Sequence, residues 1–313
     1  MSLCYDNSWL NEPYAEMPVE RYLIPHLGQR KLLIAEIAFL TEYSDYSDFV
    51  LYVGAGPGKH ISALAELFPK KVFHLFDPRA FDKNLENYKN LFTFQQYFTD
   101  EDAKKYANSK QFKRCLFISD IRTSGQNFEN EVRFNLKQQM QWCEILKPKM
   151  ASLKFRLPFN CTESIVYYAG QIRLQAWVGI DSTETRLWTD CAETIPYGCI
   201  DYSEKMFYFN RFLRADKHEV GQCELMDFCN DCAIEWLTWT AYAKKNNKTL
   251  EWCCDQVANT MQNINLGPHC KLRDLPLTER ITALKSVIEK FHENYNTVEK
   301  KRTELNEVIK RKK

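Results

Sequence analysis

The sequence predicts an α/β protein with a Rossmann-like, mostly parallel, doubly wound sheet. Short apolar runs, typical of strands buried on both faces, carry this prediction, and they lie at residues 49–53, 72–76, 91–94, 115–118 and 150–155. Segments with helical spacing separate these runs. Regular alternation of strand and helix favours a parallel sheet with helices on both faces.

The helices are predicted from apolar periodicity, and they fall at residues 28–43, 60–68, about 80–90 and 126–146. Two later apolar runs, at residues 173–177 and 185–188, have no long helix between them. Because parallel neighbours need a long crossover, these two runs are expected to form an antiparallel edge of the sheet.

Three regions are expected along the chain. Residues 1–27 are polar, aromatic and punctuated by proline, which indicates an irregular arm. Residues 28–220 hold the α/β domain. Residues 221–313 are predicted to be a helical region that packs on this domain or on a partner, with a last helix from about residue 278 and a basic tail.

The composition indicates a soluble globular protein, because 45% of the residues are hydrophobic and 27% are charged. A net charge of +1 permits a local basic groove without predicting one. No signal peptide and no long apolar run is evident, so the 12 cysteines are expected to be reduced thiols in the cytoplasm. Zinc binding by Cys229, Cys232, Cys253, Cys254, His269 and Cys270 is an alternative, but their irregular spacing favours buried thiols and no metal.

A ligand-binding loop is predicted at residues 54–58, directly after the first strand. Gly54, Gly56 and Gly58 allow a tight turn and a close approach to a ligand. Asp77 ends the second strand, where an acid can accept the hydroxyls of an adenosine ribose. This combination fits a dinucleotide or S-adenosylmethionine. Pro57 removes a donor that a pyrophosphate would need, which favours S-adenosylmethionine.

Charged residues mark further positions in or near the predicted strands and the first helix: Lys31, Asp120, Lys154 and Glu184. Lys154 lies within an apolar strand, which is uncommon for a lysine unless it is paired. The alternative is a lysine at a strand edge whose ammonium reaches water.

These four residues resemble the Lys-Asp-Lys-Glu tetrad of ribose 2′-O-methyltransferases. Four blocks are similar to the poxvirus-type cap-specific mRNA (nucleoside-2′-O-)-methyltransferases, whose members double as regulatory subunits of a poly(A) polymerase; the blocks span residues 27–33, 52–58, 118–122 and 151–159. The resemblance covers about residues 14–215 and implies a distant viral relative. It implies a methyltransferase fold, S-adenosylmethionine as cofactor, and methylation of the first transcribed nucleotide of capped mRNA.

The resemblance also implies roles for individual residues. The residues expected to line the cofactor site are Gln29, Tyr52, Gly54, Gly56, Gly58, Asp77, Arg79, Phe98 and Asp120. Phe159 and Tyr14 are expected to sandwich the 7-methylguanine of the cap, since a cationic purine between two rings gains stacking energy. Arg122 and Arg156 follow catalytic positions and are expected to bind RNA phosphates.

The chain departs from the family at the acids that bind the guanine edge. Cys161 and Ser203 stand at those positions, and Glu204 or Asp201 is expected to substitute from a neighbouring site. A second basic group is formed by Lys205, Arg211 and Arg214, which bind RNA or form a solvated face.

The predicted chemistry centres on Lys154 as the general base, oriented by Asp120 and Glu184, while Lys31 helps to place the ribose. Two alternatives stay open. One is a non-catalytic or dual role as a processivity subunit of a poly(A) polymerase, and the other is 2′-O-methylation of RNA without a cap. A viral protein of this kind is expected in the cytoplasm, in a virus factory or in the virion.

Overall fold

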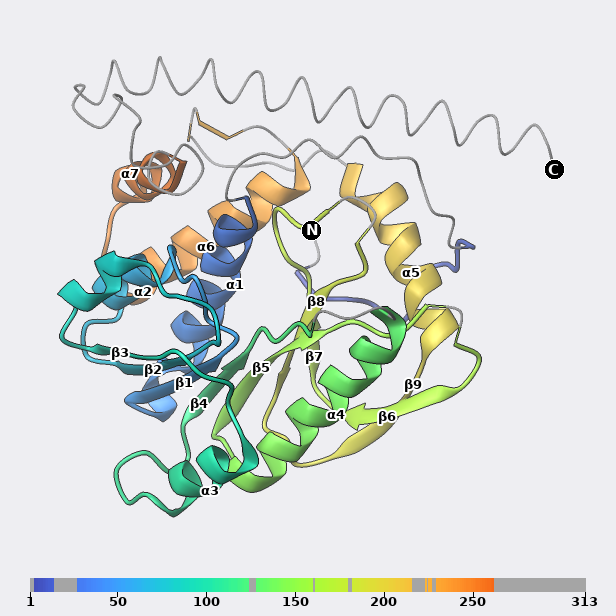
Figure 1. Ribbon diagram of the computed structural model, residues 1–313. Helices are drawn as coiled ribbons and strands as arrows, with labels where there is room; N and C mark the ends of the chain where they lie inside the picture. Colours follow the sequence, from blue (N-terminus) through green and yellow to red (C-terminus); the bar gives the residue numbers. More distant parts are fainter. Residues whose placement is uncertain are drawn as a thin grey trace.

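The computed structural model describes residues 3–13, 27–123, 128–159, 161–179, 182–215, 223, 225–226 and 229–261. A seven-stranded sheet with the order β3-β2-β1-β4-β5-β8-β7 forms its centre (Figure 1). Its strands are β1 (Phe49–Val53), β2 (Val72–Phe76), β3 (Leu91–Phe94), β4 (Leu116–Ser119), β5 (Met150–Phe155), β7 (Gln171–Arg173) and β8 (Thr185–Thr189). The first five strands are parallel, which confirms the predicted α/β class.

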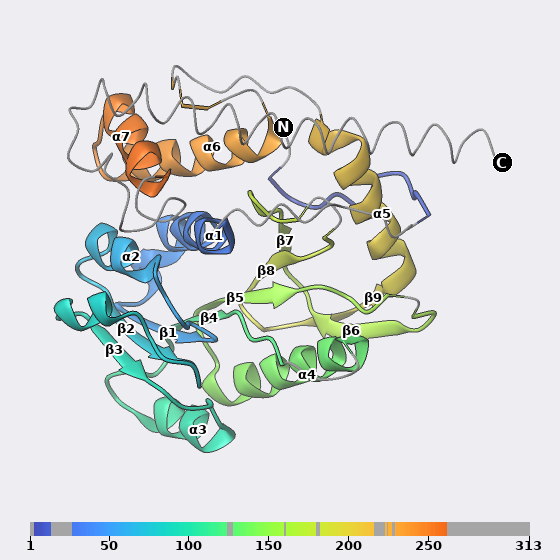
Figure 2. The same ribbon diagram turned by 45° about the horizontal axis from the view of Figure 1, so that its top comes forward.

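Helices cover both faces of the sheet. They are α1 (Leu27–Tyr43), α2 (Ile61–Leu67), α3 (Asp100–Asn108), α4 (Phe128–Leu146), α5 (Cys199–Arg211), α6 (Asn230–Lys245) and α7 (Leu250–Thr260). Figure 2 shows α1, α2, α6 and α7 on one side of the sheet and α3 and α4 on the other. All five residues of β1 are buried, as expected for a central strand that is covered on both faces.

The antiparallel part of the sheet differs in detail from the prediction. β8 pairs with β5 in antiparallel register, but it is an inner strand, because β7 pairs with its other side. The edge strand covers residues 171–173, so most of the predicted run at residues 173–177 lies outside it. Apolar content alone misplaced this strand, since Ala176 and Trp177 are buried outside any strand.

Other local features were not predicted. A separate two-stranded sheet is formed by β6 (Ser164–Tyr168) and β9 (Thr194–Gly198). The expected helix at about residues 80–90 is only a short 3-10 turn at Lys83–Asn87. Further 3-10 turns lie at Ser44–Tyr46 and Leu213–Ala215. The expected helix from about residue 278 lies outside the described residues.

The helices after residue 229 pack on the α/β domain. A buried ion pair joins Arg30 of α1 to Glu235 of α6, with 2.7 Å between Nη2 and Oε2. The indole of Trp177 donates a hydrogen bond to the same carboxylate. No helix among the described residues is long and apolar enough to cross a membrane.

Candidate active site

The glycine loop after β1 lies against the ends of two neighbouring strands. A Cβ atom on Gly54 would stand 2.7 Å from the backbone of Asp120, which follows β4. A Cβ atom on Gly56 would stand 2.7 Å from Cγ of Asp77, which follows β2. Gly54 and Gly58 also have positive φ angles of 83° and 74°. Only glycine combines these conformations with such close contacts.

Asp77 is the carboxylate that this loop encloses. Its oxygens accept hydrogen bonds from the amide of Gly56 (2.9 Å) and from the backbone and guanidinium of Arg79 (2.8–2.9 Å). Burial acts to raise the pKa of Asp77, but these donors outweigh it and hold the pKa below its usual range. The four bonds use the acceptor capacity of a carboxylate. Ribose hydroxyls can therefore bind Asp77 only if the side chain of Arg79, which is 65% exposed, turns outward.

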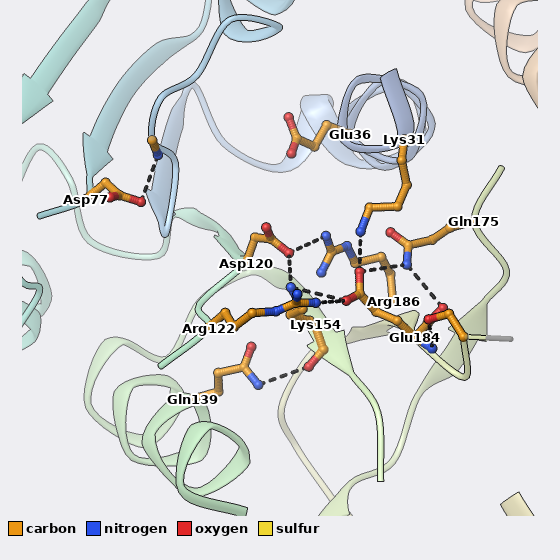
Figure 3. A network of polar contacts seen from close by, with 12 residues as sticks. Lys31, Glu36, Asp77, Asp120, Arg122, Gln139, Lys154, Gln175, Glu184 and Arg186 are labelled. Atoms are coloured by element: carbon orange, nitrogen blue, oxygen red, sulfur yellow. Dashed lines mark hydrogen bonds and ion pairs between the residues drawn. The ribbon is translucent and has the colours of Figure 1, made fainter. Parts of the chain in front are cut away.

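The four charged residues singled out in the sequence meet at one place (Figure 3). The ammonium of Lys154 lies 3.0 Å from Oδ1 of Asp120 and 3.2 Å from Oε2 of Glu184. The ammonium of Lys31 donates to the other oxygen of Glu184. Only 5–15% of each of these side chains is exposed. Elements far apart in the sequence, α1, β4, β5 and the start of β8, thus assemble one cluster of alternating charge.

This environment shifts the pKa values of Asp120, Glu184 and Lys154. Burial lowers the pKa of Lys154, and together with the nearby Lys31 and Arg186 it outweighs Asp120 and Glu184, which act to raise that pKa. Burial acts to raise the pKa of both acids, yet the surrounding cations keep the pKa of Glu184 well below its usual range and that of Asp120 at about 2. The acids therefore stay ionised while the lysine is inclined to lose its proton.

Arg186 is a fifth member of the cluster that the sequence analysis missed. Its guanidinium lies 2.6 Å from Oδ1 of Asp120, and only 4% of its side chain is exposed. Asp120 raises its pKa although burial acts in the opposite direction. Gln175 also contacts Glu184, through a 3.3 Å bond to its carbonyl oxygen. An arginine two residues after Glu184 in an otherwise apolar strand was the available signal.

A buried polar chain supports the residues assigned to the cofactor site. The hydroxyl of Tyr52 donates to Glu36, and the ring of His60 bridges Glu36 (2.9 Å) and Gln29 (3.0 Å). His60 and Tyr52 have no exposed surface. Gln29 is thus oriented from the inside of the protein. Phe98 lies in the core, where its ring packs edge-on against Phe76 and Trp142.

The segment after β5 presents an arginine and an aromatic ring. The guanidinium of Arg156 lies 4.3 Å from the centre of the Phe159 ring. Glu129, near the start of α4, binds Arg156 (2.6 Å) and accepts a bond from the amide of Phe159 (2.7 Å). Arg122 lies beside the cluster, 3.0 Å from Oε2 of Glu184, with 59% of its side chain exposed. Tyr14 lies outside the described residues.

The positions of the family's missing acids offer no acceptor to a ligand. Cys161 is buried and contacts Arg133 at 2.8 Å. Ser203 is also buried, and its hydroxyl donates to the carbonyl oxygen of Cys199 within α5. Glu204 and Asp201 are placed differently, since both accept bonds from Asn11 of the N-terminal segment (3.0 and 3.2 Å).

The second basic group is paired with acids. Lys205 binds Asp201 within α5. Arg214 is buried and binds Asp231 at 2.6 Å, while Arg211 is buried against Glu12. The expectation of a solvated face is therefore wrong for both arginines. Their contacts hold the N-terminal segment and α6 against α5.

The cysteines are free thiols wherever the structure describes them. Within the described residues no three histidine, cysteine or acidic side chains are grouped to hold a metal ion. His269 and Cys270, two of the alternative zinc ligands, lie outside these residues.

Comparison with known proteins decides the family. A family model described as "Poly A polymerase regulatory subunit" matches residues 5–250, which is most of the chain. The chain belongs to this family. The resemblance inferred from the four sequence blocks is thereby confirmed.

Relatives in this family carry the name "Cap-specific mRNA (nucleoside-2'-O-)-methyltransferase". The protein of Myxoma virus (strain Lausanne) is 28% identical over 211 residues, and that of Fowlpox virus (strain NVSL) is 30% identical over 211 residues. These alignments cover 61% and 60% of this chain. The chain spans 62% of the length of the Myxoma relative and 68% of the Fowlpox relative.

Two solved structures are also similar. Bluetongue virus VP4, described as "a multifunctional RNA-capping production-line", aligns with a TM-score of 0.44 and 15% identity over 76% of this chain and 35% of its own. A fibrillarin/Nop5p complex aligns with a TM-score of 0.28 and 14% identity over 48% of this chain and 72% of its own.

Proposed function

We propose that this protein transfers a methyl group from S-adenosylmethionine to a ribose 2′-hydroxyl of RNA, at the first transcribed nucleotide of capped mRNA. One observation carries the proposal: the ammonium of Lys154 is held between Asp120 and Glu184, beside the glycine loop. The names of the Myxoma and Fowlpox relatives support the same reaction.

The cofactor site would be formed by the glycine loop and the strand ends around it. Asp77 would accept the ribose hydroxyls once Arg79 turns outward, and Gly54 and Gly56 let the loop lie directly against Asp120 and Asp77. Gln29 and Tyr52, held by Glu36 and His60, would orient the far end of the ligand. When bound, S-adenosylmethionine supplies an electrophilic methyl group on a positively charged sulfur.

Lys154 would act on the hydroxyl. A 2′-hydroxyl must lose its proton as it attacks, and a base is most effective when its pKa is near the working pH. Burial and the neighbouring cations move the pKa of Lys154 in that direction. Asp120 and Glu184 fix the direction of its nitrogen, so the hydroxyl is aligned before the proton moves.

The surrounding cations would hold the RNA. Lys31 binds Glu184 from the opposite side to Lys154 and would steady negative charge that develops on the ribose oxygen. Arg122 borders the cluster and has an exposed side chain that suits a phosphate. Arg156 is fixed by Glu129, lines the same cleft as Arg122 and would add positive charge there.

Cap binding would use the ring of Phe159, which Arg156 and Glu129 hold in place. The guanine edge would be read by Glu204 or Asp201, because Cys161 and Ser203 are buried and already bonded. Asn11 now bonds to both of these acids and would exchange places with the guanine. In this proposal residues 1–27 contribute to the cap site and residues 28–220 form the catalytic domain.

A second role is favoured by the family itself, whose description names a regulatory subunit of a poly(A) polymerase. Residues 221–313 would carry the partner surface in that case. Co-purification with a poly(A) polymerase and longer tails in a polyadenylation assay would support this role. A dual function would leave both activities in one protein.

The deciding experiment measures methyl transfer from labelled S-adenosylmethionine to short RNAs with three 5′ ends: 7-methylguanosine cap, unmethylated cap and triphosphate. Transfer only to the methylated cap, at the first ribose, is the expected result. Equal transfer to all three would leave the chemistry and remove the cap specificity. Cofactor binding without any transfer would contradict the enzyme and favour the regulatory role.

A further inference from the structure

A cleft beside Lys154 is not used by the residues assigned above to the cofactor. It lies between α4, the segment after β4 and the end of β5, and it is open to solvent. Lys154 and Glu184 are among the residues that line it, so the cleft borders the charge cluster.

The floor of the cleft contains an unused acceptor. Gln139 of α4 donates its amide to the carbonyl oxygen of Lys154 (3.1 Å) and to the hydroxyl of Tyr167 (3.1 Å). Its Oε1 is buried and has no hydrogen-bond partner in the described part of the chain. Figure 3 shows this amide beneath Lys154. A buried acceptor without a partner is costly, which points to a donor that arrives with a ligand or with water.

Two polar side chains line the cleft on the next turns of the same helix. The carbonyl oxygen of the Asn135 amide accepts a bond from the hydroxyl of Thr123 (2.7 Å). This bond fixes the amide and leaves its NH₂ group as the donor for a ligand. Glu131 makes no hydrogen bond or ion pair anywhere within the described residues and also lines the cleft. Residues four apart on a helix stand side by side, about 6 Å apart.

We infer that this cleft binds the base of the acceptor nucleotide and selects guanine, through Glu131 and Asn135. This inference rests on the function proposed above. A carboxylate can accept both the N1–H and the N2–H of guanine, while the Asn135 amide donates to the neighbouring O6. Adenine offers one donor group and one ring acceptor on that edge, so it leaves a carboxylate oxygen without a partner.

The position of the helix agrees with this arrangement. Gln139, Asn135 and Glu131 lie on successive turns, and the rise from the first to the last is about 12 Å. In the proposed arrangement, a nucleoside whose 2′-hydroxyl faces Lys154 would have its base along the Asn135 and Glu131 turns. Val132 and Leu136 lie between them on the same wall and give the base an apolar surface to pack on.

The test compares kcat/KM on methylated-cap RNAs that differ only in the first transcribed nucleotide. The expected preference for guanine over adenine is roughly ten-fold, the order of one good bidentate contact. Glu131→Gln should bring this ratio to one or below, because a glutamine amide pairs well with adenine. Asn135→Ala should lower the ratio as well. Glu144→Gln, an exposed change on the same helix outside the cleft, should keep it.

Equal rates on all four bases, or an unchanged ratio in Glu131→Gln, would overturn this inference and leave the proposed reaction standing. Absence of transfer to any capped RNA would overturn the proposed function as well. Circular dichroism of the Glu131 and Asn135 variants shows whether they fold. Both residues are partly exposed, so a folded protein is expected.

Discussion

Arg186 provides the sharpest test of how the charge cluster works. We predict two effects of Arg186→Leu, one on stability and one on the pH dependence of methyl transfer. The guanidinium is buried and pairs with Asp120 at 2.6 Å. Removing one partner of a buried pair leaves the other charge without compensation and costs about 3 kcal/mol.

The stability effect is measured by urea denaturation. With a denaturant dependence of about 3 kcal/mol/M, the midpoint of unfolding should fall by about 1 M. Arg186→Lys keeps a positive charge beside Asp120 and should lose much less. A midpoint within about 0.2 M of the parent value for Arg186→Leu would refute the pairing as a source of stability.

The pH effect separates a positioning role from a merely structural one. Arg186 is one of the cations that lower the pKa of Lys154. Without it, the neutral lysine forms only at higher pH, so the acidic limb of the kcat/KM profile should move to higher pH. Arg186→Lys should leave the limb near its original place. A limb that does not move in Arg186→Leu would refute the electrostatic reasoning, whatever happens to stability.

Three further predictions follow from the site. Lys154→Ala should abolish methyl transfer and leave cofactor affinity within about three-fold, measured by isothermal titration calorimetry, because the lysine lines the cleft proposed for the acceptor. The pKa of Asp120 is depressed to about 2 in the folded state, so its contribution to stability is present above its unfolded value near 4 and is lost as the pH falls toward 2. Acid unfolding of Asp120→Asn should therefore depend less on pH across that window. Gly56→Ala places a methyl group 2.7 Å from Cγ of Asp77. Because this displaces the carboxylate, the affinity for the cofactor should fall by about ten-fold or more. Gly28→Ala, where a methyl group meets nothing within 4 Å, serves as its control.

Much of the fold could be predicted because parallel strands carry a strong local signal. The run at residues 49–53 is apolar throughout, and the structure buries all five residues. The two-stranded sheet of β6 and β9 escaped prediction since its strands are half-exposed and 25 or more residues apart. Pairing across such a separation depends on tertiary packing rather than local sequence.

The candidate site could be predicted where strand ends carry unusual residues. Lys154 stood out because a lysine in an apolar strand needs a partner, and the structure supplies two. Glu131 and Asn135 gave no such signal, because polar residues on an amphipathic helix are usually solvated. Only the three-dimensional arrangement shows that their face of α4 turns toward Lys154.

The charge balance explains why four residues alone do not define this site. Six charged side chains meet there, two acids and four cations: Asp120, Glu184, Lys31, Lys154, Arg122 and Arg186. The excess of positive charge favours loss of the proton from Lys154, and it also favours an anion at the mouth of the cluster. RNA phosphates can supply this anion, but their negative charge raises the pKa of Lys154 again. Arg122, which is exposed, can turn toward a phosphate, whereas the buried Arg186 remains beside Asp120. With RNA bound, the pKa of Lys154 therefore stays low only if Arg186 remains beside Asp120. This is why Arg186, which is absent from the sequence-derived tetrad, should control the pH profile.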